Sequence, residues 1–119
     1  MKVFALLVAT LVFPVSSLGQ SQPSHSVALT WTPPASGGTV TGYNAYRGTT
    51  KGGPYTVLNT STIAAPAYTD ISGLIEGTTY FYVVTATGPG GESVGSNEVS
   101  APIPISKPSA PSNLTSIVK

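Results

Sequence analysis

The side chains that could do chemistry are few and lie far apart in the sequence. His25 is the single histidine of the 119 residues, and it lies between Ser24 and Ser26. Adjacent residues on a strand point to opposite faces, and a serine–histidine–acid arrangement would have to be assembled by folding. The four acidic residues are scattered along the second half of the chain: Asp70, Glu76, Glu92 and Glu98. We therefore expect no catalytic residues, and we interpret His25 as an exposed or edge residue.

The sequence also offers few residues that could bind a metal or a cofactor. The chain has no cysteine, which excludes a disulfide framework, a zinc–thiolate site and thiol catalysis. No stretch resembles a calcium loop, and Asp70 is interpreted as a turn or strand-end residue. The glycine-rich segment 88–91 is interpreted as a hairpin turn, because no helix is expected after it to direct amides at a phosphate. The sequence thus predicts no metal and no cofactor.

The charge balance gives no sign of a basic surface that would bind nucleic acid or anionic lipid. Five basic residues face four acidic ones, and such a chain has little long-range field to attract a polyanion. The 13 glycines and 11 prolines also disfavour long helices. We expect no nucleic-acid partner.

The first 19 residues are predicted to be a secretory signal peptide. Lys2 precedes an almost wholly apolar run over residues 3–15, and Ser17 and Gly19 place small residues at the −3 and −1 positions of a cleavage site. An apolar run of about 13 residues is shorter than the ~20 that a membrane span needs. We expect a mature chain that begins at Gln20, has no membrane span and is extracellular or periplasmic.

From residue 26 onward the apolar residues alternate with a period of two. Val27, Leu29 and Trp31 share one face of the first predicted strand. Further strands are predicted at 40–47, 55–58, 67–71, 78–87 and 93–101, with turn residues between them. This pattern predicts an all-β protein: a two-sheet antiparallel sandwich of six to seven strands in one domain.

Three segments carry a resemblance to a known family: 25–31, 42–48 and 71–80. Together they resemble a fibronectin type III module of the kind common in bacterial secreted proteins, which implies an immunoglobulin-like sandwich over residues 20–104. The resemblance implies a tyrosine corner, in which the Tyr80 hydroxyl bonds back to the backbone above Leu74. It also implies that Trp31 is the central core aromatic. The expected core is completed by other inward-facing residues: Leu29, Tyr43, Tyr82 and Val84. The loop 88–93 lacks Arg-Gly-Asp, so integrin binding of that kind is not implied.

A candidate binding surface follows from the same alternation. If Tyr80 and Tyr82 face inward, Phe81 and Val83 face outward, and a neighbouring strand would add Tyr46. An apolar patch of this kind often marks a contact surface. Two other interpretations stay open: the patch is ordinary strand composition covered by the Tyr55 strand or a loop, or these aromatics form a platform for a sugar.

The tail, residues 105–119, is rich in proline and serine. Residues 108–118 resemble the opening strand of a fibronectin type III module, whereas only residues 20–24 precede the first predicted strand of the mature chain. One interpretation is a linker and the remnant of a following module. The other is that Leu114 to Val118, with Leu114 and Ile117 as contacts, supplies a strand to a neighbouring molecule and builds head-to-tail chains.

These observations predict a secreted, non-catalytic module that acts as a spacer, an adhesion unit or a protein-interaction domain. Its partner would be a protein or a polysaccharide. One alternative is a carbohydrate-binding accessory module. A further alternative is a self-assembling subunit in which the C-terminal strand complements a neighbour.

Overall fold

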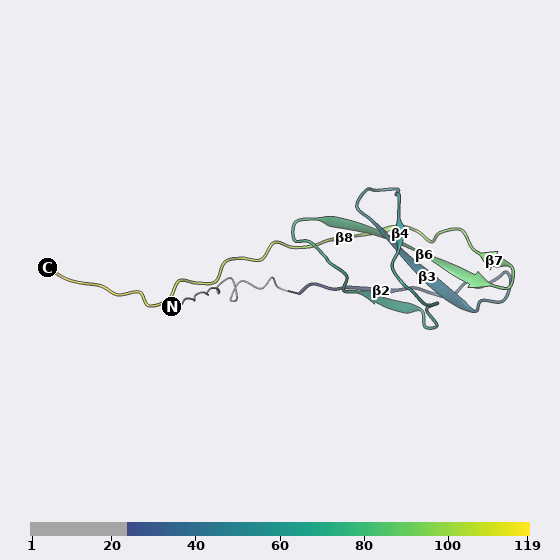
Figure 1. Cartoon of the computed structure of the whole chain (residues 1–119), viewed down its shortest axis with the longest axis horizontal. Helices are drawn as coiled ribbons and strands as arrows, with labels where there is room; N and C mark the ends of the chain where they lie inside the picture. Colours follow the sequence, from purple (N-terminus) through teal and green to yellow (C-terminus); the bar gives the residue numbers. More distant parts are fainter. Residues whose placement is uncertain (1–23) are drawn as a thin grey trace, which may run out of the picture.

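A computed structural model describes residues 24–119, where the chain forms seven strands and no helix (Figure 1). The predicted signal peptide, residues 1–19, lies outside the described residues. The strands in chain order are β2 (Val27–Thr30), β3 (Gly42–Gly48), β4 (Thr56–Val57), β5 (Ala67–Asp70), β6 (Thr79–Gly88), β7 (Gly91–Glu92) and β8 (Val99–Pro102).

The strands form two sheets, and every pairing is antiparallel. The smaller sheet contains β2 and β5. In the larger sheet β3 lies between β4 and β6, and β6 also pairs with β7 and β8. The longest pairing joins β3 to β6, from Gly42 opposite Thr87 to Gly48 opposite Phe81. The predicted two-sheet antiparallel sandwich is confirmed.

The strand predicted at 93–101 is divided in the structure. β7 forms a hairpin with β6, residues 93–98 are irregular, and the last strand begins at Val99. The hydroxyl oxygens of Ser93 and Ser96 accept hydrogen bonds from the backbone N–H groups of Ala86 and Val84, both at 2.9 Å. Serine side chains therefore replace main-chain carbonyls beside β6, and the regular ladder is interrupted there.

The buried core is built from both sheets. Its buried members are Leu29, Ala45, Tyr80, Tyr82 and Ile103. Alternation on β3 and β6 directs Ala45 and the two tyrosines inward. Ile103, which the sequence analysis did not place in the core, is held by a 2.9 Å bond from its N–H to the Thr78 carbonyl.

Trp31 packs against this core. It is partly buried against the cluster, as are Leu74 and Val84. β2 ends at Thr30, and the Trp31 N–H continues its register with β5 by donating to the Pro66 carbonyl at 3.1 Å. Its ring meets the buried Tyr43 edge-on, with centroids 5.2 Å apart. Trp31 is therefore packed against the core but is less deeply buried than Tyr80 and Tyr82, the two inward tyrosines of β6.

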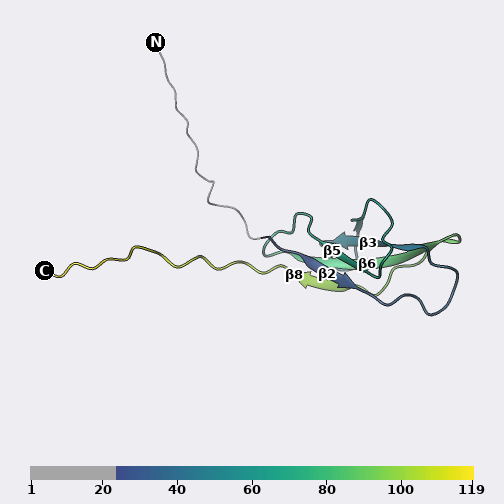
Figure 2. The same cartoon turned by 90° about the horizontal axis from the view of Figure 1, so that it is seen from below.

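The tail adds no strand to the described chain. After Ile103 the backbone has no regular pairing, and beyond Ser106 it runs away from the sandwich (Figures 1 and 2). Leu114 is 95% exposed and Ile117 is 80% exposed. The strand suggested for 114–118 is not formed within a single copy.

Candidate functional site

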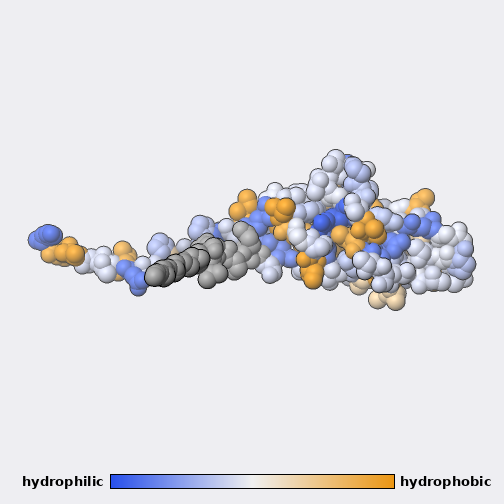
Figure 3. All heavy atoms as spheres, in the orientation of Figure 1, coloured by the Kyte–Doolittle hydropathy of each residue, from blue (hydrophilic) through white to orange (hydrophobic). Residues whose placement is uncertain are grey.

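The outer face of the larger sheet brings together the apolar residues singled out in the sequence. Tyr46 on β3 lies opposite Val83 on β6, and Phe81 lies one outward position away from Val83. On its other side Tyr46 pairs with Val57 of β4, which is 48% exposed. We call Tyr46, Val57, Phe81 and Val83 the outer-face patch. Apart from Val57, its members are half-buried. In Figure 3 the apolar side chains on the visible face form small groups separated by polar atoms.

Glu92 of β7 lies at one border of the outer-face patch. Its carboxylate accepts hydrogen bonds from the Tyr46 hydroxyl, from the Thr85 hydroxyl at 2.5 Å and from the Asn44 amide at 3.3 Å. These bonds, the one from Thr85 above all, lower the pKa of the Glu92 carboxyl. The bond to Glu92 in turn raises the pKa of Tyr46. The Tyr46 side chain therefore combines an apolar ring with an anchored hydroxyl.

A second tyrosine–glutamate pair lies beside the patch. The Tyr55 hydroxyl donates to Glu98, which also accepts from the Gly52 N–H at 2.7 Å. The hydrogen bond from Tyr55 is the main reason why the pKa of Glu98 is lowered. The Tyr55 ring lies against Gly48, where a Cβ would come within 3.3 Å of it. Gly48 is opposite Phe81, so Tyr55 flanks the patch without joining it as an open platform.

A buried ion pair on the opposite side of the same strands was missed in the sequence. Asp70 is 1% exposed and accepts hydrogen bonds from Arg47 at 2.9 Å and from the Tyr82 hydroxyl at 2.7 Å. Ser72 adds its backbone N–H at 2.9 Å and its hydroxyl at 2.5 Å. Burial raises the pKa of Asp70, but these hydrogen bonds outweigh burial and hold the pKa below its ordinary value. Asp70 is at the end of β5, as expected, and it links that strand to β3 and β6.

Tyr80 makes the backbone contacts of a tyrosine corner. Its hydroxyl accepts a hydrogen bond from the Ile75 N–H at 3.0 Å and lies 3.5 Å from the Gly73 carbonyl. The Arg47 guanidinium lies over the Tyr80 ring, 4.8 Å from its centroid. Such a cation over an aromatic face is attracted by the ring quadrupole.

His25 has an acidic partner that the sequence did not reveal. Its Nε2 lies 3.2 Å from Glu76, and Ser106 donates its N–H at 3.1 Å and its hydroxyl at 2.9 Å to the same carboxylate. The bonds from Ser106 are the largest cause of the lowered pKa of Glu76. His25 is half-buried rather than a freely exposed residue. The serine hydroxyl donates to the carboxylate and not to the imidazole, so these three residues do not form a nucleophile–base pair.

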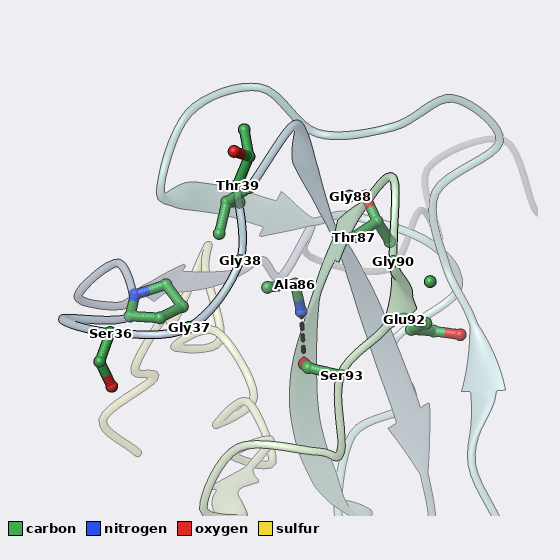
Figure 4. Close-up of a pocket in the computed structure, with 13 residues that line it drawn as sticks. Ser36, Gly37, Gly38, Thr39, Ala86, Thr87, Gly88, Gly90, Glu92 and Ser93 are labelled. Atoms are coloured by element: carbon green, nitrogen blue, oxygen red, sulfur yellow. Dashed lines mark hydrogen bonds between the residues drawn. The ribbon is translucent and has the colours of Figure 1, made fainter.

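A cleft of about 320 Å³ lies at one pole between the segment 34–40 and the β6–β7 hairpin (Figure 4). Much of its wall is backbone of the glycines in these two segments, and Glu92 is its one charged side chain. It therefore lacks the converging polar groups of a catalytic pocket. Within residues 24–119 there is also no group of three His, Asp or Glu residues suited to a metal ion. In the same range no helix is long and apolar enough to cross a membrane.

The comparisons with known proteins agree with this two-sheet architecture. The family model of the fibronectin type III domain matches residues 14–102. The chain belongs to the fibronectin type III family. The family match begins inside the segment 1–19 that is predicted to be a signal peptide.

Solved structures of fibronectin type III domains resemble this one along most of the chain. An Fn3-like protein from Clostridium thermocellum is 35% identical, with a TM-score of 0.57 over 69% of this chain and 80% of that one. The kinase region of twitchin from C. elegans is 26% identical, with a TM-score of 0.58 over 71% of this chain and 15% of that one. The fourth FNIII domain of a human protein is 26% identical, with a TM-score of 0.59 and 73% of each chain covered. No curated protein matches the chain.

Proposed function

We propose that this fibronectin type III domain is a secreted, non-catalytic module, a spacer or adhesion unit that contacts a protein partner through the outer-face patch. Domains of the family mediate protein interactions and are common outside cells. The observation that carries the proposal is the position of Tyr46, Phe81 and Val83 on the longest strand pair of the sandwich. A rigid apolar surface bordered by polar groups is typical of a protein contact site.

A non-catalytic role is supported by the state of the acidic residues. The pKa of each of the four carboxyls is lowered, and each carboxylate accepts at least two hydrogen bonds from neighbouring groups. A general acid at neutral pH needs a carboxyl whose pKa is raised towards neutrality. This set of carboxylates is suited to holding loops and strands together.

A protein partner fits the outer-face patch better than a polysaccharide does. Sugar platforms use open aromatic faces together with free polar groups. Here the hydroxyls of Tyr46 and Tyr55 are already bonded to Glu92 and Glu98. Polysaccharide binding is therefore treated as an outcome that the test below can detect and that would count against the proposal.

The test compares two lysine variants of the purified domain. Val83→Lys places a charge in the outer-face patch, and Thr69→Lys places the same charge on an exposed position of β5 in the other sheet. Each protein is immobilised and exposed to the secreted and envelope proteins of its own cells, and separately to cellulose and chitin. We expect a protein that the wild type and Thr69→Lys retain and Val83→Lys does not. Equal retention by Val83→Lys, or retention on polysaccharide alone, would refute the proposal.

Export is tested by sequencing the N-terminus of the chain recovered outside the cell. The proposed leader predicts a chain that begins at Gln20. A chain that is found only inside the cell, or that retains Met1 outside it, would contradict this part of the proposal.

A further inference from the structure

The outer edge of β2 is unpaired by any residue in the described range. β2 pairs with β5 alone within residues 24–119. The Trp31 N–H donates to the Pro66 carbonyl beside β5 at 3.1 Å, and backbone groups along a strand alternate in direction. The N–H and C=O groups of Ala28 and Thr30 therefore point to the outer edge. Such an edge is a template for an additional strand.

A cleft of about 370 Å³ lies along this edge and opens the core to solvent. Its lining combines apolar side chains from both sheets with polar ones: Leu29, Trp31, Tyr82, Val83, Val84 and Val99, together with Thr30, Thr32, Ser96 and Asn97. Leu29 and Tyr82 also belong to the buried core. In addition, the indole Nε1 of Trp31 is buried and has no hydrogen-bond acceptor among the described residues. A buried N–H group normally has a partner, so the packing around Trp31 is incomplete within the described residues.

The C-terminal tail has the properties of a strand that could cover the outer edge of β2 and the cleft beside it. Leu114 and Val118 are almost fully exposed, and their spacing places both on one face of an extended strand. A strand built from residues 114–118 would offer backbone groups to Ala28 and Thr30, and apolar side chains to the cleft. We propose that this strand of one copy adds to the outer edge of β2 in a second copy, so that molecules assemble head to tail.

The geometry favours a second copy over the molecule's own tail. Ser106 and His25 are both bonded to Glu76, so the tail leaves the sandwich at the pole where β2 begins, and it points away from the domain (Figures 1 and 2). A tail folded straight back from this pole would run parallel to β2, whereas every pairing in the domain is antiparallel. A tail that arrives from a second copy at the opposite pole runs antiparallel to β2.

The length of the tail is also sufficient. From Ser106 to Leu114 an extended chain spans at most about 26–29 Å, enough to reach the next domain when copies lie end to end. Such a contact uses two different surfaces, so a row of copies keeps a free acceptor edge at one end and a free tail at the other. Contacts of this kind produce open chains rather than closed dimers. The inference rests on the proposed export, because a chain that begins at Gln20 has only residues 20–23 ahead of the described range.

Fluorescence provides the first test, because Trp31 is the single tryptophan of the chain. The exported protein is titrated with a peptide of residues 107–119. We expect a saturable shift of the Trp31 emission to shorter wavelength. A peptide carrying Leu114→Asp should bind at least about tenfold more weakly, since it loses a buried leucine. A peptide carrying Ser112→Asp has the same added charge outside the strand and should bind like the wild type. An emission spectrum that the peptide leaves unchanged would overturn the proposal.

Light scattering on the exported protein provides the second test. We expect a mean mass that rises with concentration, a monomeric Leu114→Asp variant and a Ser112→Asp variant that behaves like the wild type. A monomer at every concentration would overturn assembly by a second copy, including the case in which the tail still alters the Trp31 emission. The Val57→Lys variant changes the outer-face patch but no residue that lines the cleft. It should assemble normally, which separates a failure of this inference from a failure of the outer-face patch.

Discussion

Asp70 and Glu92 lie on opposite faces of the β3–β6 pair, and each accepts a hydrogen bond from a tyrosine. Their different burial gives these similar hydrogen bonds different effects on stability. Asp70 accepts a hydrogen bond from Tyr82 on the inner face, and Glu92 accepts one from Tyr46 on the outer face. Both also accept hydroxyl and nitrogen donors. The differences are that Asp70 is buried and has Arg47 as a counter-ion, whereas Glu92 is exposed and has no cation bonded to it in the described range.

The same kind of hydrogen bond contributes differently to the stability of the fold in the two environments. A buried carboxylate cannot return to water when a donor is removed, so its partners have to be present in the native state. An exposed carboxylate exchanges its donors with water at little cost. The inner cluster therefore holds the two sheets together. The outer cluster leaves a polar border beside the outer-face patch that remains accessible to a partner.

The largest effect is expected from Asp70→Ala. This change leaves the Arg47 guanidinium and the Tyr82 hydroxyl without their shared acceptor, and breaking a buried pair in this way costs about 3–5 kcal/mol. Because Arg47 is partly exposed and can regain water, we expect about 3 kcal/mol of lost stability. Urea unfolding measures it, with Glu92→Ala as the matched control. A Glu92→Ala midpoint as low as that of Asp70→Ala would remove the distinction between the two clusters.

A smaller loss is expected from Tyr82→Phe. The variant keeps the buried ring and removes one of the donors to Asp70, and the carboxylate retains Arg47 and Ser72. Loss of a hydrogen bond to a charged group costs about 1.5–3 kcal/mol, and the lower end applies here because other donors remain. The same unfolding experiment measures the change. No loss at all would show that the Tyr82 hydroxyl is not a structural donor.

The pH dependence of stability should also separate the two carboxylates. The pKa of Asp70 is lowered in the folded protein, so its stabilisation is fully present above the ordinary carboxyl range and is lost as pH falls through the lowered pKa. The slope for one proton is at most about 1.4 kcal/mol per pH unit. Asp70→Asn should flatten the acid limb of the stability curve more than Glu92→Gln does. If Glu92→Gln flattened the curve more, the inner cluster would not be the main source of the acid sensitivity.

The same linkage predicts a loss of stability at alkaline pH. Burial and the bond to Asp70 raise the pKa of Tyr82 well above the ordinary tyrosine value of about 10. The stabilisation is therefore present below the ordinary value and is lost as pH rises through the raised pKa. Chemical unfolding followed between pH 8 and about pH 12 measures this loss. Tyr82→Phe should reduce it, and an unchanged alkaline limb in that variant would assign the loss to other groups.

The strands were predictable because their signal is local, whereas the polar clusters were not. Alternation of apolar residues located β3 and β6 and assigned Tyr46 and Val83 to one outward face. The partners of Asp70 and His25 depend on how the two sheets stack, since Arg47 and Glu76 lie 23 and 51 positions away from them. Alternation fixes the face of a residue but not the packing of one sheet on another.

The depth at which Trp31 is buried could not be predicted for a related reason. Large aromatic residues are common in cores, and alternation placed Trp31 on the inner face together with Leu29. In the structure Trp31 packs against the core as a partly buried residue, whereas Tyr80 and Tyr82 are buried. The interruption before β8 could not be predicted either. The hydroxyls of Ser93 and Ser96 take the place of backbone carbonyls there, and an extended segment with such serines has the same composition as a strand.

The smallest effect is expected from Tyr46→Phe, the outer counterpart of Tyr82→Phe. The hydroxyl that is removed donates to an exposed carboxylate, and water can replace it, so the urea midpoint should stay within experimental error of the wild type. Absorbance titration should nevertheless show one fewer tyrosine ionising above the ordinary range, because the bond to Glu92 raises the pKa of Tyr46. Tyr46→Phe also keeps the aromatic ring of the outer-face patch, and retention of the protein partner should survive. A midpoint lowered as much as in Tyr82→Phe would mean that the outer cluster stabilises the fold as the inner one does.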